Sequence, residues 1–155
     1  MIETEGWNIS AEELLNYNYV RRRAYVSLPM IHTTDFSFNR RYINIVESLG
    51  IKVVSKWVAS PPKESKLTPH EVFKRDLDAI SRSDLLIADV THPSHGVGME
   101  IMYAYMLGKK IIVTYKSGSK LSYMILGLPG AVLVEYRNIN ELECKLKKVL
   151  EIPQD

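Results

Sequence analysis

Short apolar runs alternate with stretches of helical periodicity in this chain, and the alternation restricts the fold more than any other feature. The apolar runs, which we interpret as strands, are AYVSLP (24–29), IKVVSKWV (51–58), DLLIADV (84–90), KIIVTY (110–115) and AVLVEY (131–136). Helical spacing covers 36–49, 69–83, the segment that follows Gly98, and 138–152. Strands that alternate with helices form parallel sheets covered on both faces. The sequence therefore predicts an α/β fold, a flavodoxin- or Rossmann-like three-layer sandwich around a five-stranded parallel sheet.

Local signals mark the ends of several elements. Thr68 precedes Pro69 and stands three residues before Glu71, which is the spacing of a capping box at a helix start. Gly50 closes the helix over 36–49, and the spacing of residues 10 and 13 predicts a short extra helix over 10–18. A length of 155 residues suits one domain. We expect a single domain over 1–155, in which 1–20 form an N-terminal extension.

Charge and composition exclude several classes of protein. The formal net charge of +2 is too small to indicate a nucleic-acid partner, and no run of about 18 apolar residues indicates a membrane span. The first ten residues lack the charge and the apolar stretch of a signal peptide, so we expect a cytoplasmic protein. Cys144 is the only cysteine, which rules out an intrachain disulfide.

Glu100 is the only acidic residue between Pro93 and Gly108, a segment that also lacks Lys and Arg. It follows SHGVG (94–98), where glycines allow a ligand close to the backbone and a helix start favours anions. Residues 101–107 are apolar or aromatic all round, which predicts a buried helix with Glu100 in its first turn. Two interpretations stay open at this point. Glu100 is either a functional carboxylate at the mouth of a ligand site or a cap of its own helix.

Asp76 is a second carboxylate in an unusual place. The helix over 69–83 has an apolar stripe formed by Val72, Phe73, Leu77 and Ile80. Asp76 lies on that stripe because it is four residues after Val72 and four residues before Ile80. Lys74, Arg75 and Asp78 are expected to point elsewhere. A core-facing carboxylate is costly unless it is paired or functional. It is either salt-bridged at the edge of the stripe or paired with Glu100, since two carboxylates are what cleavage of a glycosidic bond needs.

The loop after the third strand adds further candidates. Asp89 ends that strand, where its carboxylate either binds a ribose hydroxyl or ties down the next loop. His92 and His95 have no third ligand nearby, so no metal site and no cofactor is expected. Ser94 has no His–Asp partner pattern around it, so we interpret it as a hydrogen-bond donor to a bound anion instead of a nucleophile.

The segment SDLLIADVTHPSHGVGMEIMYAYMLGKKII (83–112) resembles the 2'-deoxynucleoside 5'-phosphate N-hydrolases and, more broadly, the nucleoside 2-deoxyribosyltransferases. The resemblance is looser from about 22 to 150 and includes RRRAYV, FKRDLDAI and LSYMILG. It implies hydrolysis of the N-glycosidic bond of (deoxy)nucleoside 5'-monophosphates to free base and (deoxy)ribose 5-phosphate. It also implies a homodimer that shares its active sites, a small-molecule nucleotide substrate, and no nucleic-acid or membrane partner.

The resemblance also implies roles for individual residues. Glu100 faces the anomeric carbon as nucleophile or electrostatic partner, Asp76 is the general acid/base, and Tyr25 orients Glu100. The substrate-binding residues that the resemblance implies are Ser94, Gly96, Gly98, Ser122, Tyr123 and Met124. Asp89, Trp57 and Asn39 are further candidates for substrate binding. The segment 122–124 would reach into the neighbouring protomer's site, with the serine on phosphate.

Two departures from the family pattern bear on the substrate. The first loop is SLPMIHTTD instead of a glycine-rich, arginine-containing loop, so the need for a phosphate stays open. Trp57 stands where relatives have a histidine; it either stacks on a base or packs under the Pro- and Lys-rich loop 59–67. The alternatives to hydrolysis are sugar transfer to another base, a non-catalytic nucleotide-binding module, and a structural domain whose acids only form caps and salt bridges.

Overall fold

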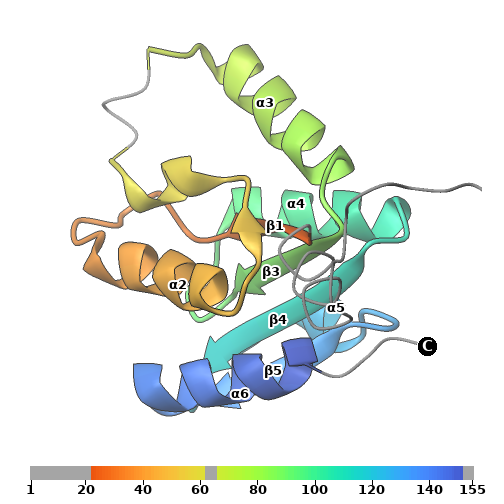
Figure 1. The fold of residues 1–155 in the computed structure, drawn as a ribbon. Helices are drawn as coiled ribbons and strands as arrows, with labels where there is room; N and C mark the ends of the chain where they lie inside the picture. Colours follow the sequence, from red (N-terminus) through yellow and green to blue (C-terminus); the bar gives the residue numbers. More distant parts are fainter. Residues whose placement is uncertain (1–21, 62–65, 152–155) are drawn as a thin grey trace, which may run out of the picture.

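A computed structural model describes residues 22–61 and 66–151, so the helix expected over 10–18 and the extension 1–20 lie outside the described residues. Five parallel strands form one sheet in the order β2-β1-β3-β4-β5 (Figure 1). They are β1 (Arg23–Ser27), β2 (Lys52–Val53), β3 (Leu85–Asp89), β4 (Lys110–Lys116) and β5 (Val132–Tyr136). This arrangement confirms the predicted α/β fold.

Helices cover both faces of the sheet. They are α2 (Ser37–Ser48), the 3-10 helix η1 (Lys56–Ala59), α3 (Pro69–Ser81), α4 (His95–Met106), α5 (Tyr123–Leu126) and α6 (Ile139–Glu151). Alternate residues of the strands separate two cores, because successive strand side chains point to opposite faces. Val26 and Ile87 pack with α2 and α6, whereas Tyr25 and Leu86 pack with α4 and the end of α3. Among the described residues, no helix combines the length and apolarity that crossing a bilayer requires.

Several local predictions are confirmed. The side chain of Thr68 accepts from the backbone of Glu71, and Glu71 accepts in return from the backbone of Thr68, which completes the capping box of α3. Gly50 has φ 81°, the left-handed conformation that ends a helix at low cost for glycine. β3 is buried along its whole length, as expected of a central parallel strand.

The second strand is shorter than predicted. The sequence predicts a strand over 51–58, but pairing with β1 stops at Val53 and η1 begins at Lys56. The buried Ser55 side chain explains the change, because its hydroxyl accepts from the backbone N–H of Val26 at 2.8 Å and donates to the Val26 carbonyl at 2.7 Å. A side chain thus replaces the next backbone partner, and the chain turns away from the sheet toward the site.

Two predictions of burial are wrong. The helix after Gly98 is not buried all round: α4 packs Val97, Ile101 and Ala104 against the sheet and exposes Met99, Met102, Tyr105 and Met106, the last to 72%. The sheet covers only one side of this helix, so its apolar composition exceeds what the described part of one chain buries. Phe73 of α3, assigned to an apolar stripe, is likewise 50% exposed.

Candidate active site

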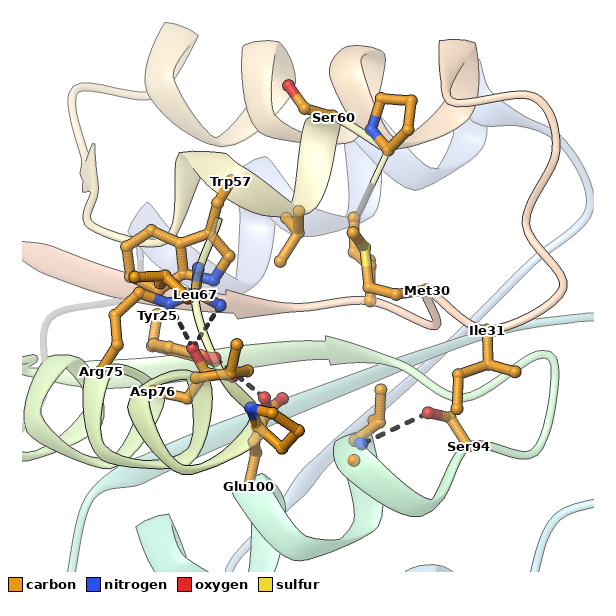
Figure 2. Close-up of a pocket in the computed structure, with 17 residues that line it drawn as sticks. Tyr25, Met30, Ile31, Trp57, Ser60, Leu67, Arg75, Asp76, Ser94 and Glu100 are labelled. Carbon is orange, nitrogen blue, oxygen red and sulfur yellow. Dashed lines mark hydrogen bonds and ion pairs between the residues drawn. The ribbon is translucent and has the colours of Figure 1, made fainter. Parts of the chain in front are cut away.

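A cavity of about 700 Å³ opens at the carboxyl edge of the sheet, on the α3–α4 side (Figure 2). Its walls come from the end of β1 and the loop that follows, from η1, from α3 and from the start of α4. Ligand sites of open parallel sheets lie at this edge, beyond the carboxyl ends of the strands. Among the described residues, the lining is mostly apolar and its charged side chains are Arg75, Asp76 and Glu100.

Glu100 is held at the base of the cavity by two hydroxyl groups of β1. The Tyr25 hydroxyl donates to Oε1 at 2.8 Å, and the Ser27 hydroxyl donates to Oε2. The helix begins at His95, so Glu100 lies in the second turn and not in the first. Ser94 is the N-cap, and its side chain accepts from the backbone of Val97 at 3.4 Å. The interpretation of Glu100 as a cap of its own helix is therefore wrong.

Burial dominates the electrostatics of Glu100. It raises the pKa of the carboxyl group from 4.5 to about 7, although the hydrogen bonds from Ser27 and Tyr25 act in the opposite direction. The negative charge of Asp76 raises this pKa further, and the positive charge of Arg75 lowers it. Burial, with Glu100 as the next cause, also raises the pKa of Tyr25 far above its usual value, so its phenol stays a proton donor.

Asp76 lies in the wall of the same cavity as Glu100. It forms a salt bridge, which is one of its two predicted roles, but the partner, Arg75, was not predicted. The Nε and Nη2 atoms of Arg75 both approach Asp76 Oδ1 at 2.8 Å. The expectation that Arg75 points elsewhere is wrong, because its long side chain turns back across the face of α3. Figure 2 shows Arg75, Asp76 and Trp57 grouped on one side of the cavity, with Glu100 below them.

Trp57 lines the cavity and contacts two residues of the group. The guanidinium carbon of Arg75 lies 4.1 Å from the centre of the Trp57 ring, within the range of a cation–π contact. The Trp57 and Tyr25 rings meet edge to face, with centroids 6.2 Å apart and an interplanar angle of 66°. Neither suggested role of Trp57, base stacking or packing under the loop 59–67, anticipated this contact with Arg75.

The remaining candidates of the α4 loop and of α5 divide between two adjoining hollows. Ser94 and Gly96 line the cavity that holds Glu100. Gly98, Ser122 and Met124 line a smaller groove of about 260 Å³, to which Ser94 also contributes. Tyr123 of α5 is 89% exposed. A Cβ added at Gly96 or Gly98 would meet no atom within 4 Å, so the chain itself does not require glycine there.

Asp89 and Asn39 lie elsewhere. Both line a separate hollow of about 530 Å³ that includes residues of α2 and the start of α6. Asp89 is 2% exposed and accepts from the Thr114 and Tyr136 hydroxyls at 2.8 Å and from the backbone of Thr91 at 3.1 Å. This is the loop-tying arrangement, one of its two predicted roles. Asn39 donates to the Val58 carbonyl at 2.7 Å, and this hydrogen bond ties α2 to η1.

Ser27 and Arg75 belong to the site but were not predicted from the sequence, whereas Met30 and Ile31 come from the first loop, which was expected to contribute to it. A signal for Ser27 was present, because residues two apart on a strand share a face and Ser27 follows Tyr25 by two. Among the described residues, no three His, Cys, Asp or Glu side chains are placed to hold a metal ion.

The fold and the cavity describe an α/β protein with two carboxyl groups in one pocket at the carboxyl edge of a parallel sheet. The sequence matches the family model described as nucleoside 2-deoxyribosyltransferase over residues 25–140, and the chain belongs to this family.

Its relatives carry names of N-glycosidic hydrolases. A protein of Thermofilum pendens, provisionally named 2'-deoxynucleoside 5'-phosphate N-hydrolase 1, is 33% identical over 83% of this chain and 94% of its own. The 5-hydroxymethyl-dUMP N-hydrolase of Esox lucius is 38% identical over 46% of this chain and 51% of its own.

Solved structures agree on the fold. The Clostridium botulinum CMP N-glycosidase BcmB superposes with a TM-score of 0.66 at 25% identity, covering 83% of this chain and 99% of that one. The 2-deoxyribosyltransferase of Bacillus psychrosaccharolyticus superposes with a TM-score of 0.61 at 19% identity, covering 86% and 98%, and supports the fold alone.

Proposed function

We propose that this protein hydrolyses the N-glycosidic bond of (deoxy)nucleoside 5'-monophosphates, which releases the free base and (deoxy)ribose 5-phosphate. The observation that carries the proposal is the partly buried Glu100 carboxyl, held by Tyr25 and Ser27 in a cavity whose wall includes Asp76. The names of the relatives support the same reaction class. A carboxyl group that is partly withdrawn from water at the base of a pocket lowers the stability of the fold when it ionises. Carboxyl groups in such places are typical of functional sites.

The reaction needs one group at the anomeric carbon and one for a proton. Glu100, when ionised, faces the anomeric carbon and either bonds to it or stabilises its positive charge as the carbon–nitrogen bond breaks. The bonding electrons leave with the base, which takes up a proton. Water then adds its oxygen to the anomeric carbon and gives up a proton, and where Glu100 has bonded to that carbon, the carbon–oxygen bond breaks and the Glu100 carboxylate is restored. Asp76 serves these proton transfers, and Tyr25 and Ser27 fix the orientation of Glu100.

The phosphate end of the substrate lies at the start of α4 in this proposal. Backbone N–H groups at a helix start favour anions, and Ser94 and Gly96 line the cavity there. Arg75 is the only Lys or Arg among the described residues that line the cavity, and it is engaged with Asp76. Within the part of the chain that the structure describes, the helix start and Ser94 are therefore the groups that would bind phosphate, because the first loop contributes the apolar Met30 and Ile31 to the cavity.

We also propose a homodimer in which α4 and α5 meet a second copy of the chain. The exposed apolar side chains of these helices are Met99, Met102, Tyr105, Met106, Tyr123, Met124 and Leu126. α4 and α5 together line the smaller groove, so the exposed residues lie on adjoining elements. An apolar surface of this kind on a small protein is typical of an interface. Because this surface adjoins Ser94, a second copy bound to it would lie next to the active site.

The test is release of free base from ribo- and deoxyribonucleosides and their 5'-monophosphates, followed by chromatography. Wild type is compared with Glu100→Ala and with Glu143→Ala, a control that removes an exposed carboxylate from α6. We expect release by wild type and the control and none by Glu100→Ala. If wild type releases no base from any compound, the hydrolase proposal fails. Compounds that then raise the melting temperature would identify a nucleotide-binding module, the function that the altered first loop favours.

A further inference from the structure

Arg75 contacts both Asp76 and Trp57 in the active site. Neither its position in the sequence nor the proposed reaction explains these contacts. Its guanidinium places two N–H groups on Asp76 Oδ1, at 2.8 Å each, and lies over the Trp57 ring at 4.1 Å. Trp57 in turn meets the Tyr25 ring, and the Tyr25 hydroxyl donates to Glu100. One cation is thus in contact with one carboxylate directly and connected to the other through two aromatic rings.

Geometry favours arginine over any other cation at this position. The planar guanidinium stacks on an aromatic face while its edge meets the carboxylate, whereas the lysine ammonium is a compact point charge with no planar face to stack. Both members of the ion pair are largely shielded from solvent, with side-chain exposures of 26% for Arg75 and 17% for Asp76. Surface ion pairs contribute little, but partial burial strengthens an interaction between charges.

We infer that Arg75 is a positioning residue, seated on Trp57, which fixes the orientation of Asp76 and offsets its negative charge so that Glu100 ionises in the same cavity. The inference rests on the proposed function and deepens it. Two carboxylates in one low-dielectric pocket resist ionising together. A cation placed on one of them reduces this repulsion.

The charged and titratable groups that act on Glu100 come from two elements. β1 contributes Tyr25, which donates a hydrogen bond, and α3 contributes Asp76 and Arg75, which oppose each other. Ser27 of β1 donates the second hydrogen bond and does not titrate in this range. Removing the Arg75 charge leaves Asp76 unopposed, so Glu100 would hold its proton to a higher pH.

The experiment compares wild type with Arg75→Lys, which keeps the charge, and with Arg75→Met, which keeps only the apolar stem. Lys74→Met is the matched control, since it removes one positive charge from the neighbouring position, where Lys74 is 73% exposed and faces Asp78 at 3.6 Å. Two readouts are taken on the full chain: the titration of the Glu100 side-chain carboxyl by carbon-13 NMR, and the pH profile of kcat for base release.

We expect the Glu100 midpoint to rise by about half a pH unit or more in Arg75→Met and to stay near that of wild type in Arg75→Lys and Lys74→Met. The acid limb of the kcat profile should move with it. At neutral pH, kcat should fall by about twofold or more in Arg75→Met from the change in ionisation, with rescue in Arg75→Lys.

An unchanged Glu100 midpoint in folded Arg75→Met would overturn the inference. So would equal losses in Arg75→Lys and Arg75→Met with an unmoved pH profile, because that is the result of a purely structural role. The carboxyl titration needs no turnover. If wild type releases no base, the proposed function fails while the titration still decides whether Arg75 controls Glu100.

Discussion

Replacing Glu100 by glutamine should stabilise this protein at alkaline pH while it abolishes base release. Burial raises the pKa of the Glu100 carboxyl from 4.5 to about 7. Each unit of such a shift corresponds to about 1.4 kcal/mol, so ionised Glu100 lowers the free energy of unfolding by at most about 3.5 kcal/mol. Glutamine resembles the protonated acid: its oxygen accepts from Tyr25, and its amide donates to the Ser27 hydroxyl.

The sign of the pH dependence follows from the direction of the shift. Below about pH 4.5 the carboxyl of Glu100 holds its proton in the folded and the unfolded chain, and its stabilising contribution is complete. Between about pH 4.5 and 7 the unfolded chain loses this proton first, so the contribution falls and is gone above the folded pKa. Glu100→Gln should therefore match wild type near pH 5 and exceed it by roughly 1–3 kcal/mol at pH 8.

Urea unfolding at pH 5, 6, 7 and 8 measures this difference directly. Other titrating groups are common to both proteins and cancel in the comparison. Glu143→Gln serves as the control, because this exposed residue of α6 carries the same chemical change outside the cavity. A wild type and a Glu100→Gln variant with parallel pH dependence from 5 to 8 would refute the claim that burial controls this carboxyl group.

Three further predictions test other parts of the structure. Gly96→Ala should raise the free energy of unfolding by about 0.5–1 kcal/mol, since its Cβ meets no atom within 4 Å in the helix, yet lower the rate of base release by occupying the cavity. Asp89→Ala should lower the free energy of unfolding in urea by about 2 kcal/mol or more, because three donors lose their shared acceptor. Met106→Glu should halve the mass of the wild-type dimer in light scattering, because Met106 lies in the proposed interface; a monomeric wild type would refute that interface.

The parts of the fold that were predicted correctly depend on local chemistry. The capping box at Thr68 and the glycine at 50 act within one turn of chain, so their effect is visible in the sequence. β2 is shorter than predicted because the Ser55 hydroxyl bonds to Val26, a contact across 29 residues that strand propensity does not register. The exposure of Met106 depends on the absence of a further layer over α4 in the described chain, which is a property of the whole fold.

In the candidate site, the meeting of Glu100, Asp76 and Tyr25 was expected, but the contact of Arg75 with Asp76 was not. Helical spacing assigns the direction of a Cα–Cβ bond, and it placed Arg75 off the face of Asp76. The length of the arginine side chain carries its charge back to the neighbouring residue and onto Trp57. Spacing arguments are therefore sound for short side chains such as Asp76 and weak for long ones.

The two-residue period of β3 explains why Asp89 and Glu100 do not share a cavity. Leu86 and Ala88 face α4, together with the β1 residue Tyr25 that holds Glu100. Leu85 and Ile87 face α2 and α6, and Asp89 continues their side of the strand, where it meets Thr114 and Tyr136. Carboxyl ends of strands gather side chains at one edge, but the pleat divides them between two faces. Position at a strand end therefore does not by itself assign a residue to the cavity. The two-residue period of β3 puts Asp89 on the face opposite to the one that α4 and Glu100 cover.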